Sequence, residues 1–186
     1  MIPIIDMHCD TIFKIYELRR QGQDVKLRSN NLHLDLLRMK EAGYMTQCFA
    51  LFTYMPYTRD RGVDPFEYAK TLSDTMDREL EANADLIRPA LSAGDIVRNY
   101  REGFLSAIKT IEEGAVYKGS PELVQFFYDH GVRKSTLTWN FENELAFRIG
   151  RSGIRKPGSI MSFRRRSGDS RRRGRMSCSS WRSSEC

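Results

Sequence analysis

The chain is poor in features that anchor proteins to membranes or cross-link them outside the cell. It contains no run of about 18 apolar residues, the length that a membrane-spanning helix requires. Its first residues lack a basic segment followed by a long apolar stretch, which argues against a secretory signal. It has only four cysteines and no Cys-x-x-Cys pair, as is typical of reducing compartments. We therefore expect a cytoplasmic protein with no membrane anchor in this chain.

Acidic residues are scarce at the C-terminal end, where the positive charge of the chain is concentrated. Residues 151–186 contain ten Arg and one Lys against two acidic residues, a net charge of +9. Because the whole chain carries +6, residues 1–150 carry −3. The overall basic character therefore gives no reason to assign nucleic-acid binding to the larger part.

Strand-like and helix-like segments alternate along residues 1–150. Apolar runs predict strands at 3–9, 45–53, 105–111 and 132–139. Capping residues and helical spacing predict helices at 11–21, 35–42, 65–80, 93–100 and 120–129, with Thr11 as the cap of the first and a loop at 54–63. Such alternation is typical of a parallel sheet with helical crossovers, which predicts the α/β class.

The composition changes abruptly after Gly150. Residues 151–186 hold ten Ser and ten Arg, and Phe163 and Trp181 are their only aromatic residues. A segment of this kind cannot bury enough apolar surface to offset its ordering entropy, so we expect a disordered tail behind a domain at 1–150. One interpretation is an arm that binds nucleic acid. We favour a frameshifted or non-native segment, because GC-rich DNA read out of frame yields these residues, and nucleic acid is then not a partner.

His8 and Asp10 stand at the end of the first predicted strand. Residues i and i+2 of a strand project to the same face, so an imidazole and a carboxylate leave its C-terminal end together. This pair suits Zn²⁺, and α/β enzymes place their chemistry at that end of their strands. The pair alone decides little, because a strand-end histidine bonded to a loop aspartate accounts for it at least as well.

Residues 5–11 (IDMHCDT) resemble the first metal-binding strand of the membrane dipeptidase (renal dipeptidase) family of zinc peptidases. Further matches follow in the same order at 31–36, 41–50, 110–114, 127–133 and 137–140. The resemblance covers residues 1 to about 150 and implies a TIM-type (β/α)₈ barrel. Such a barrel needs about 250 residues and eight strands, so the four predicted here make about half of one.

The resemblance also implies a metal centre with two zinc ions. His8 and Asp10 would bind one zinc, and Glu112 would bridge both, so that a metal-activated hydroxide hydrolyses the amide bond of a dipeptide. Glu113 is the rival for the bridging position, and a strand-end acid that caps the next helix is the structural alternative. Trp139 is the candidate substrate-binding residue, since some members have a substrate-contacting histidine there.

The remaining site residues of the family find no match in this chain. The resemblance implies two further ligand histidines and a catalytic aspartate from later strands, so the catalytic residue is unknown here. The two other histidines, His33 and His130, are expected in solvated loops; the natural role of Asp35 beside His33 is a helix N-cap.

The prediction is a zinc-dependent dipeptidase that acts on short peptides, with this chain an incomplete and inactive fragment. The alternatives are a non-enzymatic fragment whose tail binds nucleic acid and a mononuclear hydrolase of the amidohydrolase type. Half a barrel leaves unpaired strand edges, which favour aggregates or homo-oligomers. We also expect the inward-facing residues Ile4, Phe49, Ile108 and Leu137 to lack the opposing half of the core.

Deletion of residues 151–186 should leave the folded content of the rest unchanged, because the tail has no apolar period with which to pack. Far-ultraviolet circular dichroism of the full chain and of the truncated chain tests this. A clear loss of helical signal on deletion would show that the tail is structural.

Overall fold

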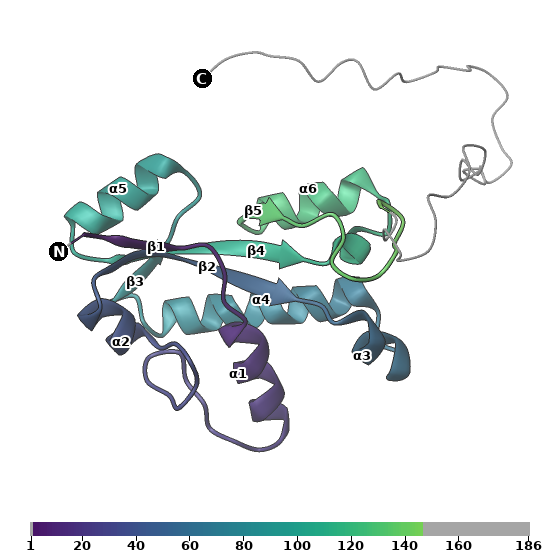
Figure 1. The fold of residues 1–186 in the computed structure, drawn as a ribbon, viewed down its shortest axis with the longest axis horizontal. Coiled ribbons are helices and arrows are strands. Elements are labelled where there is room, and N and C mark those ends of the chain that lie inside the picture. Colours follow the sequence, from purple (N-terminus) through teal and green to yellow (C-terminus); the bar gives the residue numbers. More distant parts are fainter. Residues whose placement is uncertain (1, 147–186) are drawn as a thin grey trace, which may run out of the picture. The chain divides into compact units, whose positions relative to one another are not determined.

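The computed structural model describes residues 2–146, in which five strands form one parallel sheet flanked by helices (Figure 1). The strands are β1 (Ile4–Asp6), β2 (Tyr44–Phe52), β3 (Ile87–Pro89), β4 (Leu105–Glu112) and β5 (Val132–Ser135). Their order is β1-β2-β4-β3, and β5 also pairs with β4. Strand β3 lies beside the first half of β4 and β5 beside its later half. The predicted α/β class with a parallel sheet is confirmed.

Six α-helices connect these strands, with a short 3₁₀ helix, η1 (Gly114–Tyr117), after β4. They are α1 (Thr11–Arg20), α2 (Leu36–Glu41), α3 (Met55–Asp60), α4 (Pro65–Glu81), α5 (Ala93–Arg101) and α6 (Pro121–Asp129). The side chains of Asp35, Asp64, Ser92 and Ser120 accept hydrogen bonds from the first-turn N–H groups of α2, α4, α5 and α6. These caps explain why the predicted starts of these four helices agree with the structure. No helix within residues 2–146 is both long and apolar enough to cross a bilayer.

Five details differ from the sequence predictions. Strand β1 ends at Asp6 instead of residue 9, so His8 and Asp10 follow the strand and do not lie in it. The cap of α1 is Asp10 rather than Thr11, and its side chain makes no capping hydrogen bond. Strand β3 was not predicted, because its three residues are too few to show the period of two that identifies a strand. Residues predicted as a loop form α3, which Pro at its first turn permits. Strand β5 ends at Ser135 instead of Trp139, because the chain then turns back onto η1. The predicted disordered tail lies outside the described residues.

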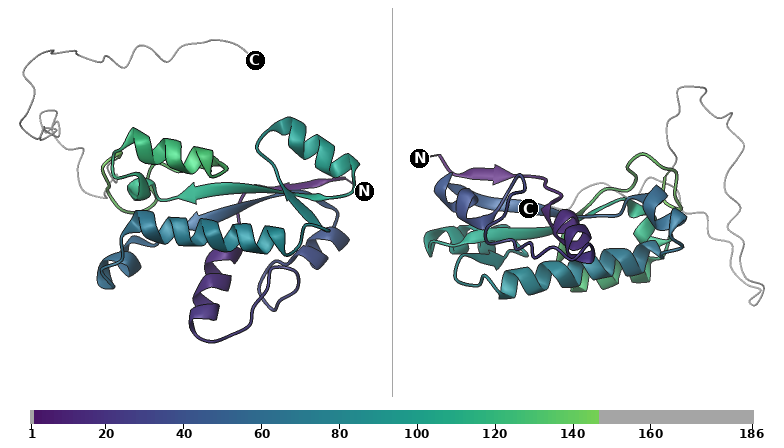
Figure 2. Two further views of the ribbon diagram at one scale, coloured as in Figure 1. Left: turned by 180° about the vertical axis from the view of Figure 1, so that it is seen from behind. Right: turned by 90° about the horizontal axis from the view of Figure 1, so that it is seen from below.

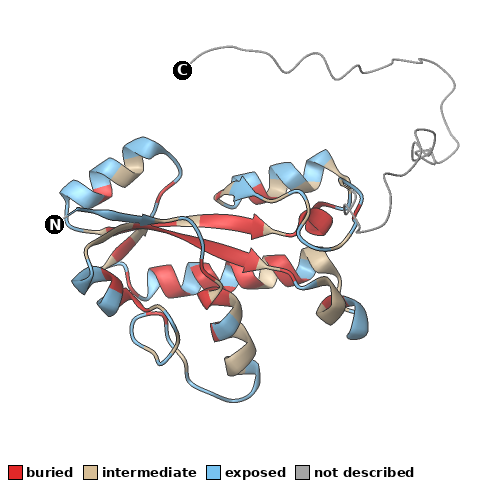
Figure 3. Cartoon of the chain, viewed as in Figure 1, coloured by how far each residue is buried: buried red, intermediate tan, exposed pale blue. Residues whose placement is uncertain are grey.

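The apolar core lies between one face of the sheet and helices α1, α4 and α6, and β2 and β4 are its most buried strands (Figure 3). Phe49 and Leu51 of β2 point into it and are fully buried. The expectation that Phe49 faces a missing half is therefore wrong, because the register of β2 turns Phe49 toward the helices. Ile4 is 38% and Leu137 61% exposed, as expected, although Leu137 follows the strand instead of lying in it.

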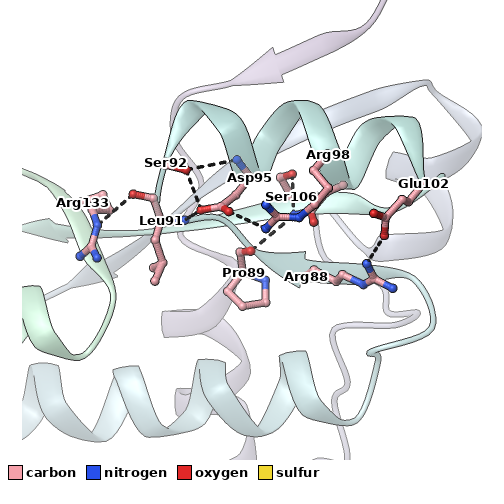
Figure 4. A network of polar contacts seen from close by, with 10 residues as sticks. Arg88, Pro89, Leu91, Ser92, Asp95, Arg98, Glu102, Ser106 and Arg133 are labelled. Atoms are coloured by element: carbon pink, nitrogen blue, oxygen red, sulfur yellow. Dashed lines mark hydrogen bonds and ion pairs between the residues drawn. The ribbon is translucent and has the colours of Figure 1, made fainter. Parts of the chain in front are cut away.

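Helix α5 lies on the face of the sheet opposite α4 (Figures 1 and 2). The buried Asn99 amide donates to Ser106 Oγ at 3.2 Å and to the Pro89 carbonyl at 3.4 Å, which ties α5 to β3 and to the start of β4. Figure 4 shows the surrounding network, in which Ser92 and Arg98 donate to Asp95. Because these contacts lie at the beginning of β4, the helix leaves the carboxyl end of that strand uncovered.

The Asp95 carboxylate should make this part of the fold sensitive to acid. Hydrogen bonds from Ser92, Arg98 and the Leu91 N–H lower the pKa of Asp95 to about 2. A carboxyl whose pKa is lower in the folded state stabilises the fold above its unfolded pKa, about 3.9, and loses this effect as the pH falls toward 2. Asp95→Asn should therefore lower the thermal midpoint near pH 6 but not near pH 2.

Thermal unfolding at several pH values, followed by circular dichroism, measures this difference. Asp24→Asn is the control, because Asp24 is an exposed carboxylate whose only ion-pair partner among the described residues is the exposed Lys26. An Asp95→Asn midpoint equal to that of the parent at pH 6 would contradict the assignment.

Candidate metal centre

His8 and Asp10 are positioned by the segment that leads from β1 into α1. Cys9 lies between them, and its carbonyl accepts a 2.9 Å hydrogen bond from the Ala50 N–H of β2. Its thiol is buried, and burial raises the pKa of Cys9 to about 12. Cys9 is buried, whereas His8 on one side of it is exposed and Asp10 on the other is half-buried, so these two side chains lie outside the core.

Glu112 reaches the same place from the last position of β4. It lies in register with Phe52 of β2, and its carbonyl accepts a hydrogen bond from Thr53 N–H at 3.3 Å. Its side chain is 18% exposed. The parallel pairing of β1, β2 and β4 therefore brings residues about a hundred positions apart to one edge of the sheet.

The three side chains form a compact cluster. His8 Nε2 lies 3.5 Å from Asp10 Oδ2, and His8 Nδ1 lies 3.6 Å from Glu112 Oε2. One possible ligand atom from each residue lies within 4.8 Å of the other two. The predicted convergence of His8, Asp10 and Glu112 is thus observed. Burial raises the pKa of Glu112, and the charge of Asp10 adds to this, while His8 opposes it.

The residues present fit a divalent metal ion. Asp10 Oδ1 and Glu112 Oε2 are buried oxygens that accept no hydrogen bond. A buried polar atom without a partner costs free energy, and a cation between the two carboxylates would remove that cost. One imidazole and two carboxylates are ligands that zinc accepts. Zinc bonds of about 2.0–2.2 Å separate neighbouring ligand atoms by about 3.4 Å, so the three candidate atoms, which lie within 4.8 Å of one another, would have to draw slightly closer around an ion.

Glu113 takes no part in this cluster. Its backbone has φ 89° and ψ 100°, and its carboxylate is buried. That carboxylate accepts hydrogen bonds from Ala115 N–H at 3.2 Å, from Trp139 N–H at 3.3 Å and from the Asn143 side-chain amide. The two consecutive acids are therefore in different environments, and only Glu112 faces His8.

A hollow of about 440 Å³ surrounds the cluster, and aromatic side chains form much of its wall. It is lined by His8, Asp10, Phe13, Phe52, Tyr54, Glu112 and Trp139. The Trp139 ring packs edge-to-face on Phe52 at 5.2 Å between centroids. The structure thus places Trp139 beside the cluster.

Phe13, Phe52 and Tyr54 were not among the site residues predicted from the sequence. Phe52 could have been found, because it occupies the last position of a strand that ends beside Glu112. His33 and His130 lie away from the cluster and are exposed. The ring of His130 stacks on Phe126 with 3.9 Å between centroids.

The parallel α/β fold and the cluster at its carboxyl edge define the class as α/β proteins with a candidate metal centre. The family model described as membrane dipeptidase (peptidase family M19) matches residues 1–158, so the chain belongs to this family of metallopeptidases. No curated protein matches the sequence.

Solved structures agree with this family. A dipeptidase AC described as a metallopeptidase of family M19 has a TM-score of 0.65 at 19% identity, over 75% of this chain and 43% of that one. A metallopeptidase from Rhodobacter sphaeroides, liganded with a phosphinate mimic of L-Ala-D-Ala, has a TM-score of 0.67 at 18% identity, over 76% and 47%. The probable dipeptidase PvdM from Pseudomonas aeruginosa has a TM-score of 0.55 at 13% identity, over 62% and 31%.

The chain therefore spans less than half the length of these structures. Since they are TIM-barrel dipeptidases, the parallel sheet of residues 2–146 is part of a (β/α)₈ barrel. The fold class predicted from the sequence is confirmed as a partial barrel of this type.

Gly114 should tolerate no side chain. A Cβ added there would lie 2.3 Å from the Leu137 carbonyl oxygen, so Gly114→Ala must displace the segment that carries Trp139. We expect a loss of stability of about 1–3 kcal/mol, the range for overpacking. Gly94→Ala in α5 is the matched control, because its Cβ would meet only Ser92 Oγ at 3.6 Å. Chemical unfolding of the two variants measures this, and equal stabilities would contradict the close approach.

Proposed function

We propose that this chain carries the N-terminal part of a zinc-dependent dipeptidase, with His8, Asp10 and Glu112 as metal ligands. The observation that carries the proposal is the convergence of one imidazole and two carboxylates whose buried oxygens lack hydrogen-bond donors. Membership in the membrane dipeptidase family supports hydrolysis of short peptides. The dipeptide mimic bound to the Rhodobacter sphaeroides relative supports the same substrate class.

In this proposal His8 and Asp10 would hold one zinc ion, and Glu112 would contribute its carboxylate to both ions that the family resemblance implies. A bound zinc ion supplies a water of lowered pKa and polarises the carbonyl group under attack. Asp10 and Glu112 contribute the negative charge that balances the cations. The ring of His8 donates one nitrogen and is oriented by the carboxylates on either side of it.

Trp139 is proposed as a substrate-binding residue. Together with Phe13, Phe52 and Tyr54 it forms an apolar wall beside the three ligands. Such a wall excludes water from the reacting bond and contacts apolar parts of a peptide. Among the described residues, the lining of this hollow includes no Lys or Arg.

We further propose that the chain alone does not turn over dipeptides. Residues 2–146 bring one histidine into the cluster, and two zinc ions need more ligands than three side chains supply.

The edges of β1 and β5 favour association with other copies. Cys9 and Cys48 are free, buried thiols, which supports a reducing location such as the cytoplasm. Nucleic-acid binding by the tail remains the alternative, and it concerns residues outside the described part.

Zinc binding by the purified chain tests the ligand assignment. The parent should bind zinc, and His8→Ala and Glu112→Gln should each weaken binding by more than the roughly 10- to 100-fold typical of outer-shell changes. His33→Ala is the control, because that imidazole is exposed and lies away from the cluster. Metal content after dialysis and competition with a chelator measure the affinities.

Two results would contradict the proposal. Unchanged zinc affinity in His8→Ala or Glu112→Gln would show that the ion is bound elsewhere. Measurable turnover of a simple dipeptide by the chain alone would show that its ligand set is sufficient.

A further inference from the structure

We propose that Glu113 is a positioning residue, whose carboxylate and the side chain of Asn143 form a clasp that holds Trp139 in the wall of the hollow. We define the clasp as the side chains of Glu113 and Asn143, the hydrogen bond that joins them, and the hydrogen bonds that each makes to other residues of the range 115–146. This inference rests on the proposed function in one respect only, namely that the hollow receives the substrate.

The backbone of Glu113 is held in a conformation that side chains oppose. Its φ of 89° lies in the region that favours glycine, and within residues 2–146 only Lys118 shares a positive φ among non-glycine residues. Glycine would adopt this conformation without strain. Such conformations persist where surrounding contacts hold them and are concentrated at functional sites, so the side chain of Glu113 must contribute something that glycine would not.

The contribution of the side chain is a set of hydrogen bonds to three separate points of the chain. The partners of the Glu113 carboxylate are N–H groups of Ala115, Trp139 and Asn143. Only 1% of Glu113 is exposed, so these bonds replace the water that a carboxylate needs. Bonds to an ionised acceptor are stronger than those between neutral groups, which makes the carboxylate an effective anchor.

Asn143 extends the anchor through the rest of the loop. Its amide also donates to the Leu137 carbonyl at 2.9 Å, and its Oδ1 accepts from Leu145 N–H at 2.8 Å and Ala146 N–H at 3.1 Å. The same Leu137 carbonyl lies against Gly114, where no Cβ could fit. One amide side chain therefore connects both ends of the segment that contains Trp139.

The clasp lies directly behind the candidate metal ligand. Glu112 and Glu113 are neighbours, so the element that fixes the backbone at Glu113 also fixes the carbon from which Glu112 reaches His8. At the other end the clasp holds the backbone N–H of Trp139, whose ring stands against Phe52 in the wall. Glu113 thus sets the spacing between the ligand cluster and the aromatic wall without touching either substrate or metal.

The test measures the environment of Trp139 in the full chain without metal. The sequence has two tryptophans, so Trp181→Phe makes Trp139 the single tryptophan, whose emission is excited selectively at wavelengths that tyrosine does not absorb. Glu113→Gly removes the carboxylate while it permits the positive φ, and Glu113→Gln keeps the shape with one acceptor. We expect a larger acrylamide quenching constant and lower anisotropy in Glu113→Gly, with Glu113→Gln between it and the parent. Glu142→Gln, an exposed acid of the same loop, should equal the parent.

Asn143→Ala provides the second arm and leaves residue 113 unchanged. It should raise the quenching constant as Glu113→Gly does, and the double variant should add little, because both remove one clasp. If Glu113→Gly loses its helical circular dichroism signal, that variant has unfolded, and the quenching constants of Asn143→Ala and Glu142→Gln are compared instead to decide whether the clasp exists. Parent-like quenching in Glu113→Gly or Asn143→Ala, or fully additive effects, would overturn the proposal.

A zinc titration separates this proposal from the proposed function. If the parent binds zinc, Glu113→Gly should weaken the affinity by about 10- to 100-fold, as outer-shell changes do, and an unchanged affinity would refute the role behind Glu112. If the parent binds no zinc, the proposed metal function fails. The Trp139 measurements then still decide whether the clasp exists.

Discussion

The parallel register of β1, β2 and β4 is the constraint on which the rest of the structure depends. Glu112 pairs with Phe52, and the Cys9 carbonyl accepts from Ala50, so the ends of the strands meet at one edge. A slip of one residue in β4 would exchange Glu112 for Glu113 and present the other face of the strand. The burial of Phe49, Leu51 and Ile111 against the helices opposes such a slip, because it would move these side chains out of the core. The same apolar packing that stabilises the sheet therefore aims the polar cluster.

Two consecutive glutamates hold their carboxylates in opposite environments. Glu113 is satisfied by N–H donors of its own chain, and its position is thereby fixed. Glu112 keeps a buried oxygen without a donor and faces His8 and Asp10, which leaves it available to a cation. The difference follows from the backbone, since the positive φ at Glu113 turns the chain away from the strand direction just after Glu112. The two neighbouring carboxylates therefore face different surroundings: Glu112 lines the hollow, and Glu113 lies against the segment that carries Trp139.

The sequence predicted the fold best where a structural feature is caused by residues close to it along the chain. Capping side chains at Asp35, Asp64, Ser92 and Ser120 located helix starts, because each satisfies N–H groups that every helix leaves free. Predictions were weaker where pairing partners decide the outcome. Strand β3 exists because Leu105–Ala107 of β4 offers three residues to pair with, and its own three residues show no period. The face to which Phe49 points was predicted wrongly for the same reason, since alternation along a strand does not say which side the helices cover.

The sequence by itself determined the chemistry that is available: a His-x-Asp pair shortly after an apolar segment, an Ile-Glu-Glu-Gly segment, and a motif order that resembles one family of metallopeptidases. These are properties of residue type and spacing along short stretches, so they can be read without knowing what lies nearby. Only the tertiary structure decided which of the two glutamates faces His8, that Phe13, Phe52 and Tyr54 stand beside Trp139, and that Asn143 connects to Glu113. Each of these depends on contacts between segments distant in the sequence, and such contacts are set by strand register and backbone conformation, which no short stretch of sequence encodes.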